Sequence, residues 1–199
     1  TAAMKFALGE NPKTVYNDKE MAPITRMATA AIIREQLYKA RRYLEEQERA
    51  AGDEDFDEPD WDMKCEALIP LLKGEIGAHF HAHRADDIFT ALRLAREFGL
   101  RPAIVHGTEG HLIAEDLREE GVPVICGPLL CDRSKPELRG LTPKTPGVLA
   151  AAGVEVALCP AHPVIPIQYL PLEAGLAIRE GMAREDALRA ITLTPARIC

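Results

Sequence analysis

The sequence has no long hydrophobic run and no excess of basic residues, and these two absences exclude several classes of protein. Its uninterrupted apolar runs cover only a few residues, too short for a transmembrane helix. No basic segment followed by an apolar one marks a signal peptide. With 24 Lys and Arg against 31 Asp and Glu, the formal net charge is −7, which argues against a nucleic-acid binder. We therefore expect a cytoplasmic protein that binds neither membranes nor nucleic acid.

Several local motifs are missing as well. Neither Gly-x-Gly-x-x-Gly nor the phosphate loop occurs, so nucleotide binding has no support. The 5 cysteines form no Cys-x-x-Cys pair, and we expect reduced, mostly buried thiols. A cysteine-dependent hydrolase of α/β type is an open alternative, but no Gly-x-Ser-x-Gly elbow or equivalent supports it.

Most of the negative charge lies in one stretch, residues 45–62, which contains ten acidic side chains and one basic side chain. The stretch lacks the Asp-x-Asp-x-Asp-Gly pattern of a calcium loop. We interpret it as a solvated insertion in an otherwise single domain that covers residues 1–199.

Short apolar segments alternate with amphipathic ones along the rest of the chain, whose composition, 47% hydrophobic and 28% charged, is that of a globular protein. The pattern predicts strands over residues 4–8, 77–83, 102–105, 122–126 and 154–158. It predicts helices over residues 23–49, 67–72, 86–98, 109–120, 148–152, 167–180 and 184–193. Such alternation is typical of parallel β/α units, arranged either as an open doubly wound sheet or as a barrel.

All 6 histidines fall at or near the predicted strand ends. His79, His81 and His83 recur with a period of two, which places them on one face of a strand. His81 and His106 each come where a strand gives way to a loop, and we predict that they bind a divalent metal, with Zn²⁺ as the expected ion. A metal held there lowers the pKa of a bound water to roughly 7. We expect His79, deeper in its strand, to be packed or hydrogen-bonded.

Other polar residues near the same strand ends are candidates for the site. Glu10 follows the first predicted strand and is predicted as a further metal ligand, while Lys5 could serve only if it were carboxylated. The candidates for contact with substrate are His83, Arg84 and His111. Arg84 suits a substrate carboxylate, although capping of the next helix by Asp86 is the simpler role for this segment.

Three motifs resemble the second half of the barrel of a metal-dependent amidohydrolase. His81-Ala82-His83 is similar to the histidine motif on the fifth strand of that family, and Val105-His106-Gly107 to the histidine on its sixth strand. Residues 186–198 resemble the segment after the last barrel strand, which usually reads Ala-Leu-x-x-Ile-Thr-x-x-Pro-Ala. The resemblance extends over nearly the whole chain outside the acidic insertion, and the imidazolonepropionase-like branch is the most similar.

This resemblance implies a partial TIM barrel with about strands 4–8 of a (β/α)8 amidohydrolase. The family carries a His-x-His pair on its first strand, and no such pair precedes this segment. Because a complete barrel needs ~250 residues, we expect the chain to be a fragment that forms a homo-oligomer or associates with a barrel-completing partner.

The resemblance also identifies a departure from the family. Its eighth strand carries an aspartate that binds metal and handles the proton of the attacking water, and Ala161 occupies that position here. His162 is predicted to act as the catalytic base instead. Two hypotheses follow: a metal-dependent hydrolase of C–N bonds in a small, perhaps cyclic, amide, or a non-catalytic barrel fragment that binds a partner or ligand.

Overall fold

The computed structural model describes residues 2–53 and 55–199 and contains a single parallel sheet. Its five strands lie in the order of the sequence, and every neighbouring pair is parallel. They are β1 (Ala3–Ala7), β2 (Gly77–Ala82), β3 (Pro102–His106), β4 (Val124–Cys126) and β5 (Val156–Leu158). All five correspond to predicted strands, so the predicted parallel α/β fold is confirmed, and it is consistent with part of a (β/α) barrel.

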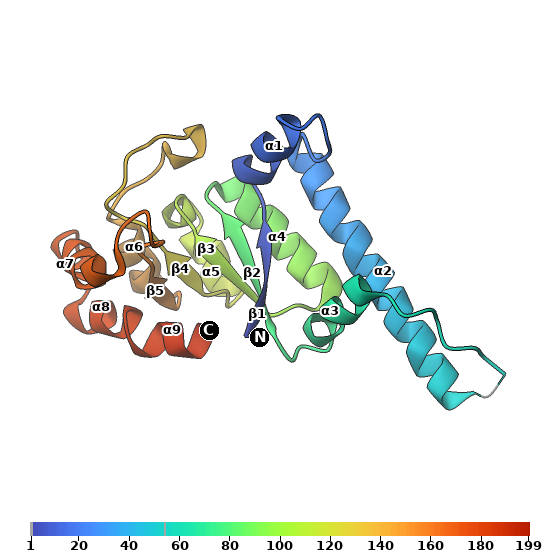
Figure 1. Cartoon of the computed structure of the whole chain (residues 1–199). Coiled ribbons are helices and arrows are strands. Elements are labelled where there is room, and N and C mark those ends of the chain that lie inside the picture. Colours follow the sequence, from blue (N-terminus) through green and yellow to red (C-terminus); the bar gives the residue numbers. More distant parts are fainter. Residues whose placement is uncertain (1, 54) are drawn as a thin grey trace.

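Helices follow each strand and cover one face of the sheet (Figure 1). The α-helices are α1 (Glu10–Asn17), α2 (Arg26–Gly52), α3 (Met63–Leu72), α4 (Ala85–Phe98), α5 (Ala114–Glu119), α6 (Thr145–Ala151), α7 (Leu170–Arg179), α8 (Arg184–Ala190) and α9 (Leu193–Ile198). Short 3-10 helices are η1 (Gly110–Leu112), η2 (Pro136–Leu138) and η3 (Ile167–Tyr169).

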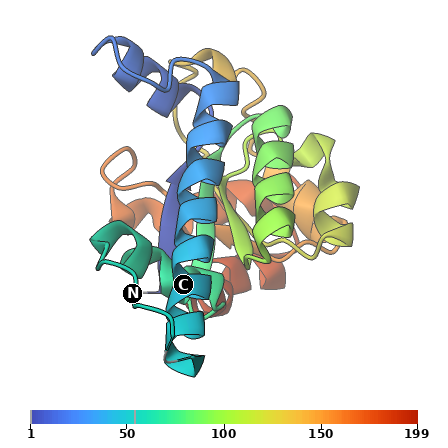
Figure 2. The same cartoon turned by 90° about the vertical axis from the view of Figure 1, so that its right-hand side faces the viewer.

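The hydrophobic core lies between the sheet and its helices. Ala78, Phe80 and Ala82 on β2 are fully buried on this side, as are Ile104 on β3 and Val124 on β4. Strand alternation sends the intervening residues of β2 to the opposite face, where the histidines lie. Helix α4 packs against β2 and β3, and α2 packs against α4, so that α2 and α4 run side by side (Figure 2).

Helix α2 is 27 residues long and projects beyond the sheet (Figure 1). Thr25 caps its amino-terminal end, because the Thr25 hydroxyl accepts a hydrogen bond from the Ala28 N–H. Residues 45–52 of the acidic stretch continue this helix, and the remaining described residues of that stretch form the connection to α3. No helix in residues 2–53 and 55–199 is both long and apolar enough to cross a membrane.

The structure departs from the sequence expectation at two ends of the chain. The Gly-Glu-Asn-Pro segment after β1 has a composition typical of a turn and lies outside the predicted helices, but helix α1 begins there at Glu10. Pro12 is compatible with this because the first turn of a helix does not need its missing N–H. Near the carboxyl terminus, the segment after α8 forms a separate helix, α9.

Candidate metal centre

Strand β2 presents two of the candidate ligands at its carboxyl end. His81 lies on the strand and His83 directly follows it, two positions apart, so both side chains leave the same face of the sheet. His81 is 7% exposed and His83 is 6% exposed. Their neighbours Phe80 and Ala82 fill the core on the other face, which fixes the direction in which the two imidazoles point.

His106 joins them by a departure from regular strand geometry. In the ladder its Cα is paired with that of Ala82, whose side chain points toward the helices. His106, however, has a φ of 80°, in the left-handed region that non-glycine residues rarely occupy. Its ring lies with those of His81 and His83 instead of among the helices. Unusual backbone conformations of this kind are concentrated at functional sites.

The three imidazoles form a compact group. One nitrogen from each of His81, His83 and His106 lies within 4.8 Å of the other two. The ring of His106 stacks on that of His83, with centroids 4.5 Å apart, and lies edge-on to that of His81 at 4.6 Å. Imidazole is a common ligand of divalent transition metals, so this group can hold a divalent metal ion.

Hydrogen bonds orient each of the three rings. His106 Nδ1 lies 2.7 Å from the carbonyl oxygen of Gly127; since a carbonyl accepts, the proton is on Nδ1 and the lone pair is on Nε2. His83 Nδ1 lies 2.7 Å from the buried hydroxyl of Thr108. The amide nitrogen of Asn11 in α1 donates to His81 Nε2 over 3.2 Å. The contacts at Nδ1 of His83 and His106 leave Nε2 of each ring available and set ring orientation, as at metal sites. The Asn11 contact instead uses the lone pair of His81 Nε2, so a metal binding at that nitrogen would have to displace the Asn11 amide.

The electrostatic environment keeps these imidazoles neutral. Burial, followed by the nearby His106, lowers the pKa of His81 to about 3. Burial, followed by His106 and His81, lowers the pKa of His83 to about 2. Burial also lowers the pKa of His106, against the opposing effect of its hydrogen bond to Gly127. Neutral imidazoles are the form that binds metal, so the chemistry of the three side chains fits a divalent cation.

A carboxylate that the sequence analysis did not single out lies next to the group. Glu137, in the long loop between β4 and α6, is 1% exposed, and its Oε1 lies 3.7 Å from His83 Nε2. The sequence offered one general signal: the loop over residues 128–145 is longer than a connection requires. Nothing in its composition distinguishes Glu137 from its charged neighbours, because the contact with β2 is purely tertiary.

Two further positions from the sequence analysis, Glu10 and Ala161, lie on the segments that follow β1 and β5. Glu10 opens α1, and its backbone N–H donates to Glu137 Oε2 over 2.9 Å. Ala161 follows β5 and has a φ of 49°, with its N–H directed at Cys159 Sγ. The proposed ligand role of Glu10 stays a prediction.

The remaining predicted residues are not members of the histidine group. Arg84 is exposed and pairs with Asp86 over 2.9 Å. His111, in η1, lies 3.0 Å from the hydroxyl of Thr145 through its Nδ1. His162 is exposed in the turn after β5. Their roles in binding and catalysis stay predictions.

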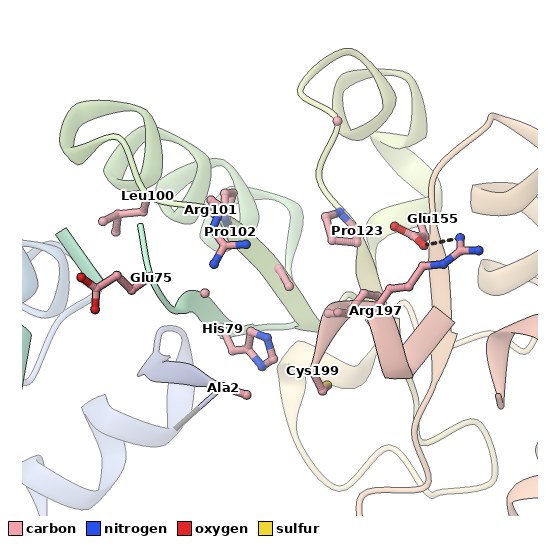
Figure 3. A pocket seen from close by; sticks show the side chains of 14 residues that line it. Ala2, Glu75, His79, Leu100, Arg101, Pro102, Pro123, Glu155, Arg197 and Cys199 are labelled. Carbon is pink, nitrogen blue, oxygen red and sulfur yellow. Dashed lines mark ion pairs between the residues drawn. The ribbon is translucent and has the colours of Figure 1, made fainter. Parts of the chain in front are cut away.

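A cavity of about 580 Å³ lies at the opposite end of the sheet, away from the histidine group (Figure 3). It is lined by Gly77 and Pro102, which begin β2 and β3, and by both chain ends at Ala2 and Cys199. His79 is the histidine that faces it, and burial lowers the pKa of that imidazole. Chemistry in parallel α/β proteins is concentrated at the carboxyl ends of the strands, so the histidine group, and not this cavity, is the candidate site.

Comparisons with known proteins agree with this interpretation of the fold. No protein-family model matches the chain, and no curated protein sequence matches it. A solved structure, that of an amidohydrolase from Thermotoga maritima MSB8, superposes with a TM-score of 0.95 at 43% sequence identity. The match covers 99% of this chain and 51% of that one, so the chain spans about half the length of its structural neighbour. At this level of identity and similarity, and with the histidine group in place, the chain belongs to the amidohydrolase superfamily.

Proposed function

We propose that the chain forms part of the active site of a metal-dependent hydrolase that cleaves the C–N bond of a small amide. The observation that carries this proposal is the convergence of His81, His83 and His106 at the carboxyl ends of β2 and β3. We propose Zn²⁺ as the metal, because neutral imidazole nitrogens are among its preferred ligands.

The three histidines of the group are proposed as the residues that bind the metal. His81, His83 and His106 hold the ion, with His81 on β2 and His83 directly after the same strand. A divalent metal, when bound, supplies the Lewis acidity that activates water and polarises the amide carbonyl. The hydrogen bond from His106 Nδ1 to the Gly127 carbonyl keeps the lone pair of Nε2 directed toward the group.

The substrate contacts are proposed from residues at the rim of the group. Arg84 is exposed and can reach a substrate carboxylate by exchanging its partner Asp86. His111 contributes a ring held by Thr145. Glu10, in the first turn of α1, is proposed as a further metal ligand and not as a substrate contact. His162 acts as the base in place of the missing aspartate. A cyclic amide, the substrate class of the imidazolonepropionase-like branch, is our prediction for the substrate, and the cytoplasmic location also stays a prediction.

A non-catalytic role is the second candidate, and Ala161 is the observation that favours it. An alanine neither binds metal nor accepts a proton, and loss of a general base costs ~10²–10⁴-fold in rate. The sheet has edges at β1 and β5 in the described part of the chain, and unpaired edges favour association. On this hypothesis the chain is a homo-oligomer or is completed by a partner chain. A stable monomer in sedimentation analysis would argue against it.

The two candidates separate in one experiment. We expect the purified chain to bind Zn²⁺ and the loaded protein to hydrolyse members of a panel of cyclic amides. Metal binding without hydrolysis of any amide would favour the non-catalytic role. Absence of metal uptake by a folded chain would contradict the proposed hydrolase.

A further inference from the structure

Glu137 is an ionisable side chain whose burial has no explanation within the folded chain alone. It is 1% exposed, and its Oε1 has no hydrogen-bond partner among the described residues. Leaving a buried carboxylate oxygen without a partner costs free energy, which proteins usually avoid by pairing it or binding a metal to it. The nearest ionic contact of that oxygen is His83 Nε2, at 3.7 Å.

The other carboxylate oxygen is held in place from a distant part of the chain. Glu137 Oε2 accepts the backbone N–H of Glu10 at 2.9 Å. Gly9 makes room for it, because a Cβ at Gly9 would lie 2.8 Å from Oε2. Burial raises the pKa of this carboxyl, and the charge of Lys135, two positions away, partly opposes that rise. The Lys135 ammonium nevertheless donates to the side-chain oxygen of Asn11 and not to Oε1 of Glu137. The carboxylate is thus fixed by one oxygen and free at the other, and the free oxygen points at the histidine group.

The spacing is that of two ligands on one ion. Ligand atoms about 2.1 Å from a tetrahedral metal are separated by roughly 3.4 Å, and the Oε1–Nε2 distance here is 3.7 Å. A hydrogen bond would be shorter. Three neutral imidazoles also leave the charge of a divalent cation uncompensated, and a buried carboxylate supplies that compensation.

We propose that Glu137 binds the metal held by His81, His83 and His106, supplying the carboxylate that is absent at Ala161. The inference rests on the metal site of the proposed function and adds a ligand from the loop after β4.

The chain provides a matched control for the test. Glu173 in α7 is also fully buried, with one oxygen accepting a backbone N–H, that of Leu129, over 2.8 Å and the other without a partner among the described residues. The histidine group contains neither carboxylate, but Glu137 lies 3.7 Å from His83, whereas no hydrogen bond or ion pair joins Glu173 to a histidine among the described residues. Glu173→Gln therefore reproduces the loss of a buried carboxylate without removing a proposed ligand.

The test measures the Zn²⁺ dissociation constant of the full chain by competition with a chromophoric chelator. It compares wild type with Glu137→Gln, Glu173→Gln and His106→Ala, and circular dichroism monitors folding of each metal-free variant. We expect Glu137→Gln to weaken binding by roughly 100-fold, since contacts beyond the ligands themselves are already worth 10–100-fold. Glu173→Gln should leave the constant unchanged.

Each other outcome overturns a defined part of the account. If His106→Ala abolishes binding while Glu137→Gln binds as tightly as wild type, the inference about Glu137 is wrong and the metal site stands. If Glu137→Gln and Glu173→Gln weaken binding equally, the effect is a general consequence of losing a buried carboxylate, and the inference is again wrong. If the folded wild type takes up no Zn²⁺, both the inference and the proposed function fail.

Discussion

Glu137 Oε2 accepts a hydrogen bond of 2.9 Å from the backbone N–H of Glu10, which lies 127 positions earlier in the chain. This contact joins the first turn of α1 to the loop between β4 and α6, directly beside the histidine group. Lys135 and Asn11 make a second contact between the same two segments. The loop after β4 and the segment after β1 therefore form one unit around the candidate metal centre.

The packing at Gly9 makes this unit sensitive to a single methyl group. Gly9 has a φ of 80°, and an added Cβ would lie 2.8 Å from Glu137 Oε2 and 3.1 Å from Asp87 Oδ2. We expect Gly9→Ala to lower the free energy of unfolding by about 1–3 kcal/mol, measured by urea denaturation. Gly175→Ala is the control, because its Cβ would meet no atom within 4 Å and the change should be neutral or stabilising. Equal effects of the two substitutions would contradict this account.

The ion pair between Arg26 and Asp87 anchors α2 to the start of α4. Arg26 Nε lies 3.1 Å from each Asp87 oxygen, and the Asp87 side chain is 4% exposed. Because loss of the arginine leaves the buried Asp87 carboxylate unpaired, Arg26→Gln should destabilise the chain by about 2–3 kcal/mol. The exposed pair of Arg84 and Asp86 is the comparison: Asp86→Asn should cost under about 1 kcal/mol. Indistinguishable melting temperatures for the two variants would show that burial does not govern the Asp87 contact.

The histidine group predicts the pH dependence of stability in the metal-free chain. The pKa of His81 falls from 6.5 to about 3 on folding, and that of His83 from 6.5 to about 2. Below pH 6.5 the unfolded chain binds protons that the folded chain does not, so stability falls as the pH drops from 6.5 toward 3. Each histidine contributes a slope of up to about 1.4 kcal/mol per pH unit. Urea titrations in chelator between pH 7.5 and 4.5 measure this slope.

Substitutions separate this titration from packing. His83→Gln should reduce the slope, whereas Phe80→Leu, on the same strand and without a titrating group, should lower stability by a similar amount at every pH. A slope unchanged by His83→Gln would mean that other groups control the acid response.

The hydroxyl of Thr108 tests whether ring orientation matters for metal affinity. It lies 2.7 Å from His83 Nδ1 in a buried environment. We expect Thr108→Val to weaken Zn²⁺ binding about 10-fold, because partners that orient a ligand histidine typically contribute 10–100-fold. Thr145→Val removes the contact to His111 and a weak hydrogen bond of 3.4 Å to the Thr108 carbonyl. Neither contact involves a ring of the histidine group, so this change should not alter the affinity. If both valine variants bind Zn²⁺ as wild type does, the orientation of His83 is not set by its hydroxyl partner.

The sequence was sufficient to predict the sheet and most of the histidine group. Short β-branched runs bounded by glycine and proline identify buried parallel strands, and histidines at strand ends converge because parallel strands end at one edge. Period-two spacing also placed His83 with His81, although we predicted a substrate contact for it and not membership of the group. These patterns are local in the sequence, so they can be recognised without knowledge of the tertiary structure.

The features that the sequence did not reveal depend on tertiary contacts. Helix α1 was not predicted because Gly-Glu-Asn-Pro is equally typical of a turn. Tertiary contacts to Glu137 and Lys135 hold the start of this helix in place. Glu137 itself lies among polar residues of a long loop, and only the fold brings it to His83. The left-handed backbone of His106 likewise has no signature in the order of residues.

The most direct test of the central claim is X-ray absorption spectroscopy of the chain loaded with Zn²⁺. The account predicts imidazole scattering from His81, His83 and His106 with nitrogen and oxygen ligands at about 2.0–2.1 Å. The imidazole signal should be reduced in His106→Ala. A dominant shell at about 2.3 Å would identify sulfur ligands from the unpaired cysteines, and would contradict the assignment of the metal centre to the histidine group.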